Sequence, residues 1–358
     1  MAVHFYKVKV KDIRKETEEC VSVAFDIPQA LQDTFKYTHG QYITLRSFIN
    51  GEDVRRSYSL CSSPLENEWR VAIKKVDGGL FSTYANNQLK PGDEIELIPP
   101  MGNFTSTLDK TRSKKYIAFA AGSGITPVLS VIKTILATEP LSHVTLIYGN
   151  RNRHSIIFKE AIEGLKNKYI DRFRVIHILS REITDAAINC GRIDKEKCHL
   201  LFTNFANISA DEFFICGPQE MIFCIKDFLK EKGIPDNKIH FELFTTREDT
   251  SAKKQRSAIS KPGEPQSNVT IKHDGIAFDF NLDYDGEDIL DAALHHGVDL
   301  PYSCKSGVCC TCKARLEEGQ VSMDANYGLE PEEIEAGYIL CCQSHPVTEK
   351  VVIDFDIK

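Results

Sequence analysis

The sequence predicts three successive modules: an antiparallel β-barrel, an α/β domain built on a parallel sheet, and a small C-terminal α+β domain. Three observations support this order: short β-rich segments fill residues 1–110, strands and helices alternate over 113–246, and a compact run of cysteines begins at Cys304. Residues 247–267 are polar and rich in helix-breaking residues, which predicts a linker. The last module is therefore expected over residues 268–358.

Length and composition are those of an ordinary soluble multidomain chain. The 358 residues suit two or three domains, and 42% of them are hydrophobic. No apolar run approaches the roughly 20 residues of a membrane span. The first residues do not resemble a secretory signal, so the twelve cysteines indicate a reducing, cytoplasmic compartment.

The net charge of −7 is unevenly divided along the chain. Residues 268–358 hold 6 Lys and Arg against 18 Asp and Glu, whereas the preceding part is mildly basic. An acidic module joined to a basic one suits the transient docking of an electron carrier, although such charges can equally serve only to solvate each surface. No basic patch with interleaved aromatic residues points to nucleic acid.

Six segments of the first module are predicted strands: Val3–Val10, Cys20–Asp26, Tyr42–Phe48, Val54–Leu60, Trp69–Lys75 and Glu94–Ile98. Turn residues separate these segments, as in a small antiparallel barrel. One helix is predicted over Phe81–Leu89, after Gly78-Gly79.

Two stretches of this barrel predict a flavin site. The first, Arg56-Ser57-Tyr58-Ser59, places a phosphate-binding guanidinium, a phenol that can stack on a flat ring, and two hydroxyls along one strand. The second, Gly79-Leu80-Phe81-Ser82-Thr83, opens the helix, whose free N–H groups can hold a phosphate. Either stretch alone is a weak signal, but together they favour a flavin. We assign to the same site three residues that lie between them: Ile73, Lys74 and Val76.

The second module is predicted to alternate between strands and helices. The expected strands are Tyr116–Ala121, Val144–Tyr148, Phe173–Leu179, Glu212–Cys216 and His240–Leu243, and the expected helices are Ile125–Ala137, Ile156–Tyr169 and Glu220–Lys232. This alternation predicts a parallel sheet with helices on both faces, which is the architecture of nucleotide-binding domains.

A glycine-rich turn follows the first strand of this module. It reads Gly122-Ser123-Gly124-Ile125-Thr126-Pro127, and its glycines allow the backbone to approach a pyrophosphate at the helix N-terminus. Pro127 stands where the usual dinucleotide motif has a third glycine. Ser180, Arg181 and Arg192 offer a hydroxyl and two guanidinium groups where a 2′-phosphate would lie. These residues favour NADPH over NADH, although surface ion pairing is the alternative role for both arginines.

Two further stretches are expected near the nicotinamide. Cys216-Gly217-Pro218 ends a strand at the start of a helix, and Glu242 lies in the last strand of the module. A buried core position is nearly as probable for the Cys216 thiol.

The C-terminal module begins with a predicted hairpin, Asn268–His273 and Ile276–Leu282, joined by Asp274-Gly275. Two helices, Asp288–His296 and Pro331–Ala336, and two strands, Thr311–Leu316 and Val351–Asp354, are expected to follow. Its cysteines form C-x4-C-x2-C, followed by a later pair, which is the plant-type spacing around a [2Fe–2S] cluster. The ligand candidates are Cys304, Cys309, Cys312 and Cys342. Zinc is the main alternative, although structural zinc usually takes two close pairs of ligands.

These motifs resemble the ferredoxin–NADP⁺ reductase superfamily, in its form fused to a C-terminal plant-type ferredoxin of β-grasp fold. The resemblance covers nearly the whole chain and includes the cysteine strings 301–312 and 342–346. It implies FAD rather than FMN in the barrel and NADPH on the second module. It also implies Cys342 as the fourth ligand, because a single cysteine precedes Gln-Ser-His-Pro in that family. Cys341 departs from this pattern.

The resemblance further implies a reductase that serves an oxygenase, such as a ring 1,2-epoxidase or a ketosteroid hydroxylase. NADPH would deliver hydride to the flavin past Ser59, Cys216 and Glu242, and the flavin would pass single electrons to the cluster. The expected electron acceptor is an oxygenase of the di-iron type. Two other classes remain as alternatives: an electron carrier whose flavin domain no longer works, and a zinc-binding adaptor.

Overall fold

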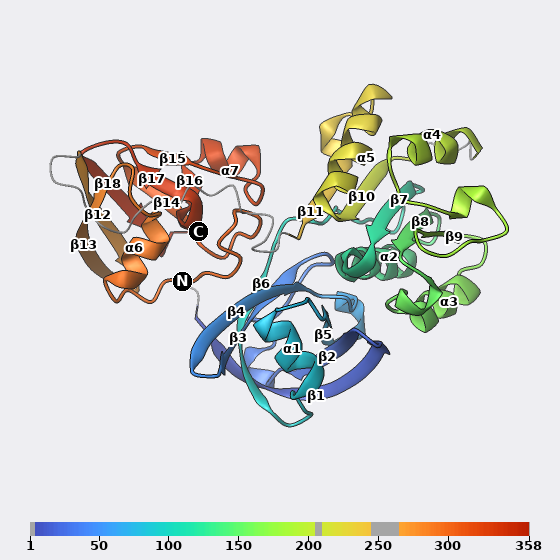
Figure 1. Cartoon of the computed structure of the whole chain (residues 1–358), viewed down its shortest axis with the longest axis horizontal. Coiled ribbons are helices and arrows are strands. Elements are labelled where there is room, and N and C mark those ends of the chain that lie inside the picture. The colour runs from blue at the N-terminus through green and yellow to red at the C-terminus, as the bar shows by residue number, and fades with distance from the viewer. Residues whose placement is uncertain (1–3, 205–209, 245–264, 358) are drawn as a thin grey trace. The chain divides into compact units, whose positions relative to one another are not determined.

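The computed structural model describes residues 4–204, 210–244 and 265–357 (Figure 1). The chain divides into two compact units. The larger unit holds Lys7–Val54 and Tyr58–Phe244 and contains most of the first two modules. The smaller unit contains the described residues from 265 onward. Most of the predicted linker, residues 247–264, lies outside the described residues.

The first sheet is a six-stranded antiparallel barrel with the strand order β4-β3-β6-β1-β2-β5. Its strands are β1 (Tyr6–Thr17), β2 (Cys20–Asp26), β3 (Tyr42–Ile49), β4 (Glu52–Ser59), β5 (Trp69–Lys74) and β6 (Glu94–Met101), and its helix is α1 (Leu80–Asn87). A bridge between Leu60, directly after β4, and Val71 on β5 joins the two ends of this order. The predicted antiparallel barrel is confirmed.

Strand β1 is longer than predicted, because it continues to Thr17 instead of ending at Val10. Its second half is polar and shows no apolar alternation that a sequence pattern could detect. The ladder to β2 holds it, with register shifts at Val10/Asp12 and Lys15/Thr17 that mark bulges.

The second sheet is parallel, with the order β11-β10-β7-β8-β9. Its strands are β7 (Lys115–Ala121), β8 (His143–Asn150), β9 (Phe173–Leu179), β10 (Glu212–Gly217) and β11 (Ile239–Leu243), and its helices are α2 (Ile125–Thr138), α3 (Lys159–Lys168), α4 (Lys195–Asn204) and α5 (Gln219–Glu231). The strand order reverses between β7 and β10. In open sheets of this kind, ligands bind outside the carboxyl ends of the strands at that point.

Two details of this sheet differ from the prediction. Helix α3 begins at Lys159 and not at Ile156, because Phe158 has a left-handed backbone (φ 61°) and is buried in the core. Helix α4 was not predicted, because its apolar residues follow no clear helical period.

The described part of the C-terminal module is a five-stranded mixed sheet with the order β13-β12-β18-β14-β16 and a separate pair, β15-β17. The strands are β12 (Gln266–His273), β13 (Ile276–Asp283), β14 (Lys313–Glu318), β15 (Val321–Met323), β16 (Tyr338–Leu340), β17 (Ser344–Pro346) and β18 (Lys350–Asp354), and the helices are α6 (Ile289–His295) and α7 (Pro331–Glu335). The parallel pairing of β12 with β18 among antiparallel neighbours fits the predicted α+β ferredoxin-like fold. Strands β15, β16 and β17 were not predicted, because three residues show no period.

The barrel and the parallel sheet share one buried core within the larger unit. Cys61 and Ala72 of the barrel belong to the same hydrophobic cluster as Ile125 and Val128 of α2. The Ser130 hydroxyl on α2 also donates to the carbonyl of Ser62 at 2.6 Å. This packing holds the end of β4 in a defined place beside the parallel sheet. Among the described residues, no helix is both long enough and apolar enough to cross a membrane.

Candidate functional site

Three residues predicted to line the hydride path lie together in the larger unit. Cys216 on β10 is the register partner of Glu242 on β11, so the two residues lie side by side on neighbouring parallel strands. The Ser59 hydroxyl, at the end of β4, donates to Glu242 Oε2 at 2.8 Å. Ser59 is 4% exposed and Cys216 is fully buried. The structure therefore gathers side chains from both modules at the end of β10.

Burial governs the protonation of this group. Removal from water raises the pKa of the Glu242 carboxyl to about 8, and the hydrogen bond from Ser59 only partly opposes this shift. Burial, followed by the nearby Glu242 carboxylate, raises the pKa of the Cys216 thiol well above its usual range. Near neutral pH both side chains are mainly uncharged, so the group presents hydrogen-bonding atoms without a fixed charge.

The raised pKa of Glu242 predicts a pH-dependent effect of Glu242→Gln on stability. An unfolded chain releases this proton near pH 4.5, whereas the folded chain keeps it up to about pH 8, so the wild type loses stability as pH rises across this interval. Glutamine cannot ionise, so the variant should not lose this stability. The free energy of unfolding of the variant minus that of the wild type should therefore increase as the pH rises from 5 to 8. The gain should be about 1.4 kcal/mol per pH unit.

Denaturant unfolding of the flavin-loaded protein at pH 5, 6, 7 and 8 measures this difference. The matched control for the loss of one negative charge is Glu160→Gln, at an exposed position on α3. A difference between Glu242→Gln and wild type that does not change with pH would contradict the raised pKa.

The predicted phosphate turn stands at the reversal point of the parallel sheet. Gly122 to Gly124 form a 3₁₀ turn before α2, and Gly122 has a positive φ of 53°. The carbonyl of Gly122 accepts a hydrogen bond from the Tyr148 hydroxyl at 2.9 Å. A Cβ on Gly124 would lie 2.2 Å from the carbonyl oxygen of Cys216, so only glycine allows this approach. The turn therefore packs directly against the end of β10.

The remaining residues of this turn, and Gly217 and Pro218 of the neighbouring Cys216–Pro218 stretch, have structural roles. The Thr126 hydroxyl donates to the carbonyl of Ser123 at 3.0 Å. Pro127 lies in the first turn of α2, where a backbone N–H would have no partner inside the helix. Gly217 leaves no room for a side chain between Met221 and Ala121. Pro218 caps α5.

The residues predicted to bind a 2′-phosphate lie at the carboxyl edge of the sheet. Ser180 and Arg181 follow β9, and the bridge between Leu179 and Cys190 brings the segment before Arg192 to the same edge. Ser180, Arg181 and Arg192 are exposed. Among the described residues, neither Arg181 nor Arg192 forms an ion pair, so the alternative role of surface ion pairing finds no partner here.

Glu182, the acidic neighbour of Arg181, is held by Arg153. Its carboxylate pairs with the Arg153 guanidinium and accepts the Arg153 backbone N–H at 2.8 Å. The backbone hydrogen bond and the guanidinium lower the pKa of Glu182. Arg151 and Arg153, which the sequence analysis did not single out, follow strand β8 at the carboxyl edge of the sheet.

The residues predicted to bind the flavin lie in β4, β5 and the turn into α1. The Tyr58 ring lies over Phe81, with ring centroids 5.7 Å apart, and the Arg56 guanidinium donates to the carbonyl of Arg55 at 2.7 Å. Lys74, assigned to the same site, has its Nζ about 4.0 Å from where a Cβ on Gly122 would lie. The Lys74 side chain of the barrel thus ends beside the phosphate turn.

Other residues of this set serve the local structure. The Ser82 hydroxyl accepts the backbone N–H of Val76 at 3.1 Å and donates to the carbonyl of Gly79 at 3.2 Å. Thr83 donates its backbone N–H to the same carbonyl. Ile73 is fully buried. The side chains of Ser82 and Ile73 therefore shape the turn and the barrel core, and Ser57 lies on β4 between Arg56 and Tyr58.

The four predicted cluster ligands gather in the C-terminal module. The thiols of Cys304 and Cys309 lie 3.1 Å apart, and the Cys342 thiol contacts those of Cys304 and Cys312. Gly307 has φ 73°, and a Cβ there would lie 2.7 Å from the carbonyl oxygen of Ala325. Four thiols around one loop, with no room for a side chain at its tip, fit the ligand set of a [2Fe–2S] cluster.

The two spare cysteines have other surroundings. The Cys310 thiol donates to the carbonyl of Gly328 at 2.6 Å, and burial raises its pKa to about 12. Cys341 is fully buried in the hydrophobic core of the module, and burial raises its pKa well above the usual range.

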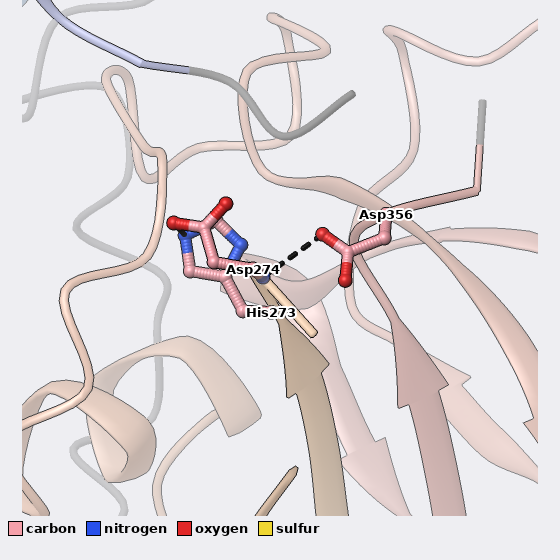
Figure 2. A group of neighbouring side chains, drawn as sticks. All are labelled: His273, Asp274 and Asp356. Carbon is pink, nitrogen blue, oxygen red and sulfur yellow. Dashed lines mark hydrogen bonds and ion pairs between the residues drawn. The ribbon is translucent and has the colours of Figure 1, made fainter. Parts of the chain in front are cut away.

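A second group of possible metal ligands, His273, Asp274 and Asp356, lies at the β12–β13 turn, with donor atoms within 4.8 Å of one another (Figure 2). The Asp356 carboxylate accepts the backbone N–H groups of Asp274 and Gly275, both at 2.9 Å. Asp274 has a left-handed backbone (φ 54°). Stabilisation of this tight turn is sufficient to explain why these side chains meet.

An antiparallel barrel, a nucleotide-binding parallel sheet and a four-thiol ferredoxin-like module together define an electron-transfer oxidoreductase. Comparison with known families agrees for each module. The family described as oxidoreductase FAD-binding domain matches residues 7–106, oxidoreductase NAD-binding domain matches 119–227, and 2Fe-2S iron-sulfur cluster binding domain matches 271–347.

The chain belongs to the ferredoxin–NADP⁺ reductase-like family of oxygenase reductases, which join FAD-binding, NAD-binding and [2Fe–2S] domains in one polypeptide. One of the subunits of 1,2-phenylacetyl-CoA epoxidase from Escherichia coli (strain K12) is 43% identical over 355 residues, which cover 99% of this chain and 98% of that protein. The ferredoxin reductase component of 3-ketosteroid-9-alpha-monooxygenase from Rhodococcus rhodochrous is 34% identical over 361 residues, which cover 97% of this chain and 95% of that protein. The solved structure of phthalate dioxygenase reductase shares the fold, with a TM-score of 0.59, 23% identity and 98% coverage of both chains. The predicted resemblance and fold class are confirmed.

Proposed function

We propose that this chain is the NADPH-dependent reductase component of an oxygenase of the phenylacetyl-CoA epoxidase type, working in the cytoplasm. The observation that carries the choice of partner is the 43% identity to the E. coli epoxidase protein over 99% of this chain and 98% of that protein. The ketosteroid monooxygenase reductase also matches over all three modules, but at 34% identity, so the higher identity favours the epoxidase type. Shared cofactor motifs alone would not distinguish partners. The expected partner is an oxygenase with a di-iron centre.

The roles of the site residues are part of this proposal. Residues 1–110 would bind FAD, residues 113–246 the nicotinamide nucleotide, and residues 268–358 the cluster through Cys304, Cys309, Cys312 and Cys342. When bound, the flavin accepts two electrons as hydride from the nicotinamide and releases them singly to the cluster. Ser59, Cys216 and Glu242 would exclude water and orient the two rings without introducing a fixed charge.

The choice of NADPH over NADH is supported by the charges at the edge of the parallel sheet. Arg181 and Arg192 are exposed and form no ion pair among the described residues. Glu182, which could otherwise bind an unphosphorylated ribose, is paired with Arg153. Two exposed guanidinium groups at this edge favour the 2′-phosphate.

Reconstitution with two oxygenases tests the proposed partner. The purified reductase is combined with NADPH and either the remaining components of phenylacetyl-CoA epoxidase or the oxygenase component of 3-ketosteroid-9-alpha-monooxygenase. We expect product formation to match NADPH consumption only with the first. The second is the main alternative, because its reductase is 34% identical to this chain.

Cytochrome c reduction by NADPH is the control for a working electron path. Active cytochrome c reduction with no epoxidase product would contradict the partner, while leaving the reductase class intact. Coupled turnover with the ketosteroid monooxygenase in place of the epoxidase would assign the chain to the alternative.

A further inference from the structure

Gln343 lies between the two separated parts of the predicted cluster site. It ends the 3₁₀ turn η8 (Cys341–Gln343), directly after the proposed ligand Cys342, and is only 2% exposed. A buried amide must satisfy its hydrogen bonds inside the protein, so its partners indicate what it does.

The Gln343 amide nitrogen faces three acceptors. Nε2 donates to the carbonyl of Lys305 at 3.2 Å and to the carbonyl of Cys342 at 2.6 Å, and it lies 3.7 Å from Cys342 Sγ. An amide oxygen in that place would be repelled by two carbonyl oxygens, so the nitrogen has to occupy it. One N–H therefore reaches the Lys305 carbonyl in the cysteine loop, and the other is shared between the carbonyl and the sulfur of Cys342.

The loop residue that receives this hydrogen bond has an uncommon backbone. Lys305 follows Cys304 and has φ 52°, in the left-handed region that costs energy for a residue with a side chain. Its ammonium pairs with Asp291 on α6 and lies 4.7 Å from the centre of the Tyr302 ring. The hydrogen bond to Gln343 stabilises this turn from the inside, while the ion pair holds it from the outside.

The backbone carbonyl and the Cγ atom of Gln343 make two further contacts, with Asp324 and Gly307. Its backbone carbonyl accepts the N–H of Asp324 at 2.9 Å. Its Cγ lies 3.1 Å from where a Cβ on Gly307 would be, so the side chain packs under the glycine of the cysteine loop. The side chain thus supports the loop at Lys305 and Gly307 and is anchored beside Cys342.

We propose that Gln343 is a positioning residue that tunes the [2Fe–2S] cluster of this protein. It holds the loop that carries Cys304 at a fixed distance from Cys342, and its second N–H is shared between the Cys342 carbonyl and the Cys342 sulfur. Hydrogen bonds to cluster sulfurs stabilise the reduced, more negative state and so raise the reduction potential. The inference rests on cluster binding by the C-terminal module and is independent of which oxygenase accepts the electrons.

The test compares Gln343→Leu with wild type, both isolated anaerobically with flavin and cluster in place. The measured quantities are iron and acid-labile sulfide content, the reduction potential from a redox titration of the electron paramagnetic resonance signal, and the rate of iron release to a chelator. We expect near-complete iron in the variant, a one-electron reduction equilibrium about tenfold less favourable, which is about 59 mV more negative, and severalfold faster iron release.

Ser344→Ala is the matched control. The Ser344 hydroxyl is fully buried and donates to the carbonyl of Leu340 at 2.9 Å, with no hydrogen bond to Lys305 or Cys342. Its loss should lower the melting temperature and leave the potential unchanged. A potential and a release rate in Gln343→Leu no different from those of Ser344→Ala would overturn the inference, because Gln343 would then only fill space.

Gln343→Asn covers the case in which the leucine variant assembles no cluster. The shorter amide keeps the donor, so assembly should return, with a potential more negative than that of wild type. Assembly as poor as that of leucine would refute a role for the amide. A wild-type protein that itself holds no iron would instead refute cluster binding, so the two failures are distinguishable.

Discussion

Cys342→Ser is expected to remove the [2Fe–2S] cluster, whereas Cys341→Ser should leave it in place. The Cys342 thiol contacts the thiols of Cys304 and Cys312, while the Cys341 thiol is buried among apolar side chains of the core. A serine hydroxyl is a poor replacement for a thiolate ligand of iron. The first variant should therefore lose most of its iron and its visible cluster absorption while keeping its flavin.

The neighbouring variant is the control for the cost of a buried hydroxyl. Cys341→Ser places a hydroxyl in a fully buried apolar position, which should cost about 1–3 kcal/mol of stability without removing iron. Iron and acid-labile sulfide analysis, together with visible spectra, separates the two variants. Full iron in Cys342→Ser and loss of iron in Cys341→Ser would reverse the assignment of the fourth ligand.

Arg181→Ala is expected to weaken the use of NADPH much more than the use of NADH. The Arg181 guanidinium is exposed and forms no ion pair with any residue that the structure describes, so it can form charge-assisted hydrogen bonds with a 2′-phosphate. One such contact contributes about 1.5–3 kcal/mol. The value of kcat/KM for NADPH should fall by about 10- to 100-fold, mainly through KM. The value for NADH should change little, because NADH lacks that phosphate.

NADH serves as the internal control in this experiment, with cytochrome c as the electron acceptor for both nucleotides. Arg192→Ala should produce a similar but separate loss, since Arg192 follows the segment bridged to the same strand end. An equal fall for both nucleotides in Arg181→Ala would mean that Arg181 acts on the fold or on a phosphate common to both.

The secondary structure around some motifs could be predicted from the sequence, because the residues of each motif are adjacent in the chain. The turn Gly122–Pro127 does lie between a strand and a helix, and Gly124 meets the end of β10 where no Cβ fits. The parallel sheet was also predictable, since strand and helix periods alternate clearly over 113–246. The long polar half of β1 and the helix α4 carry no such period, and the prediction missed them.

The surroundings of Glu182 could not be predicted from the sequence. Glu182 follows Arg181, and an acidic residue at this edge of the sheet can bind an unphosphorylated ribose. The structure pairs Glu182 with Arg153, which is 29 residues earlier in the chain. That partner belongs to the neighbouring strand end, and no local pattern relates the two positions.

By itself, the sequence indicated the kind of chemistry: the C-x4-C-x2-C spacing, the phosphate turn and the flavin-type strand are short patterns of residues that lie close together in the chain. Only the tertiary structure decided how Ser59 meets Glu242, 183 residues away, and why that carboxyl has a pKa of about 8. It also decided that the Gln343 amide reaches Lys305, 38 residues earlier. The physical reason is that desolvation and hydrogen bonding depend on which segments pack together, and packing joins residues that are distant in the chain.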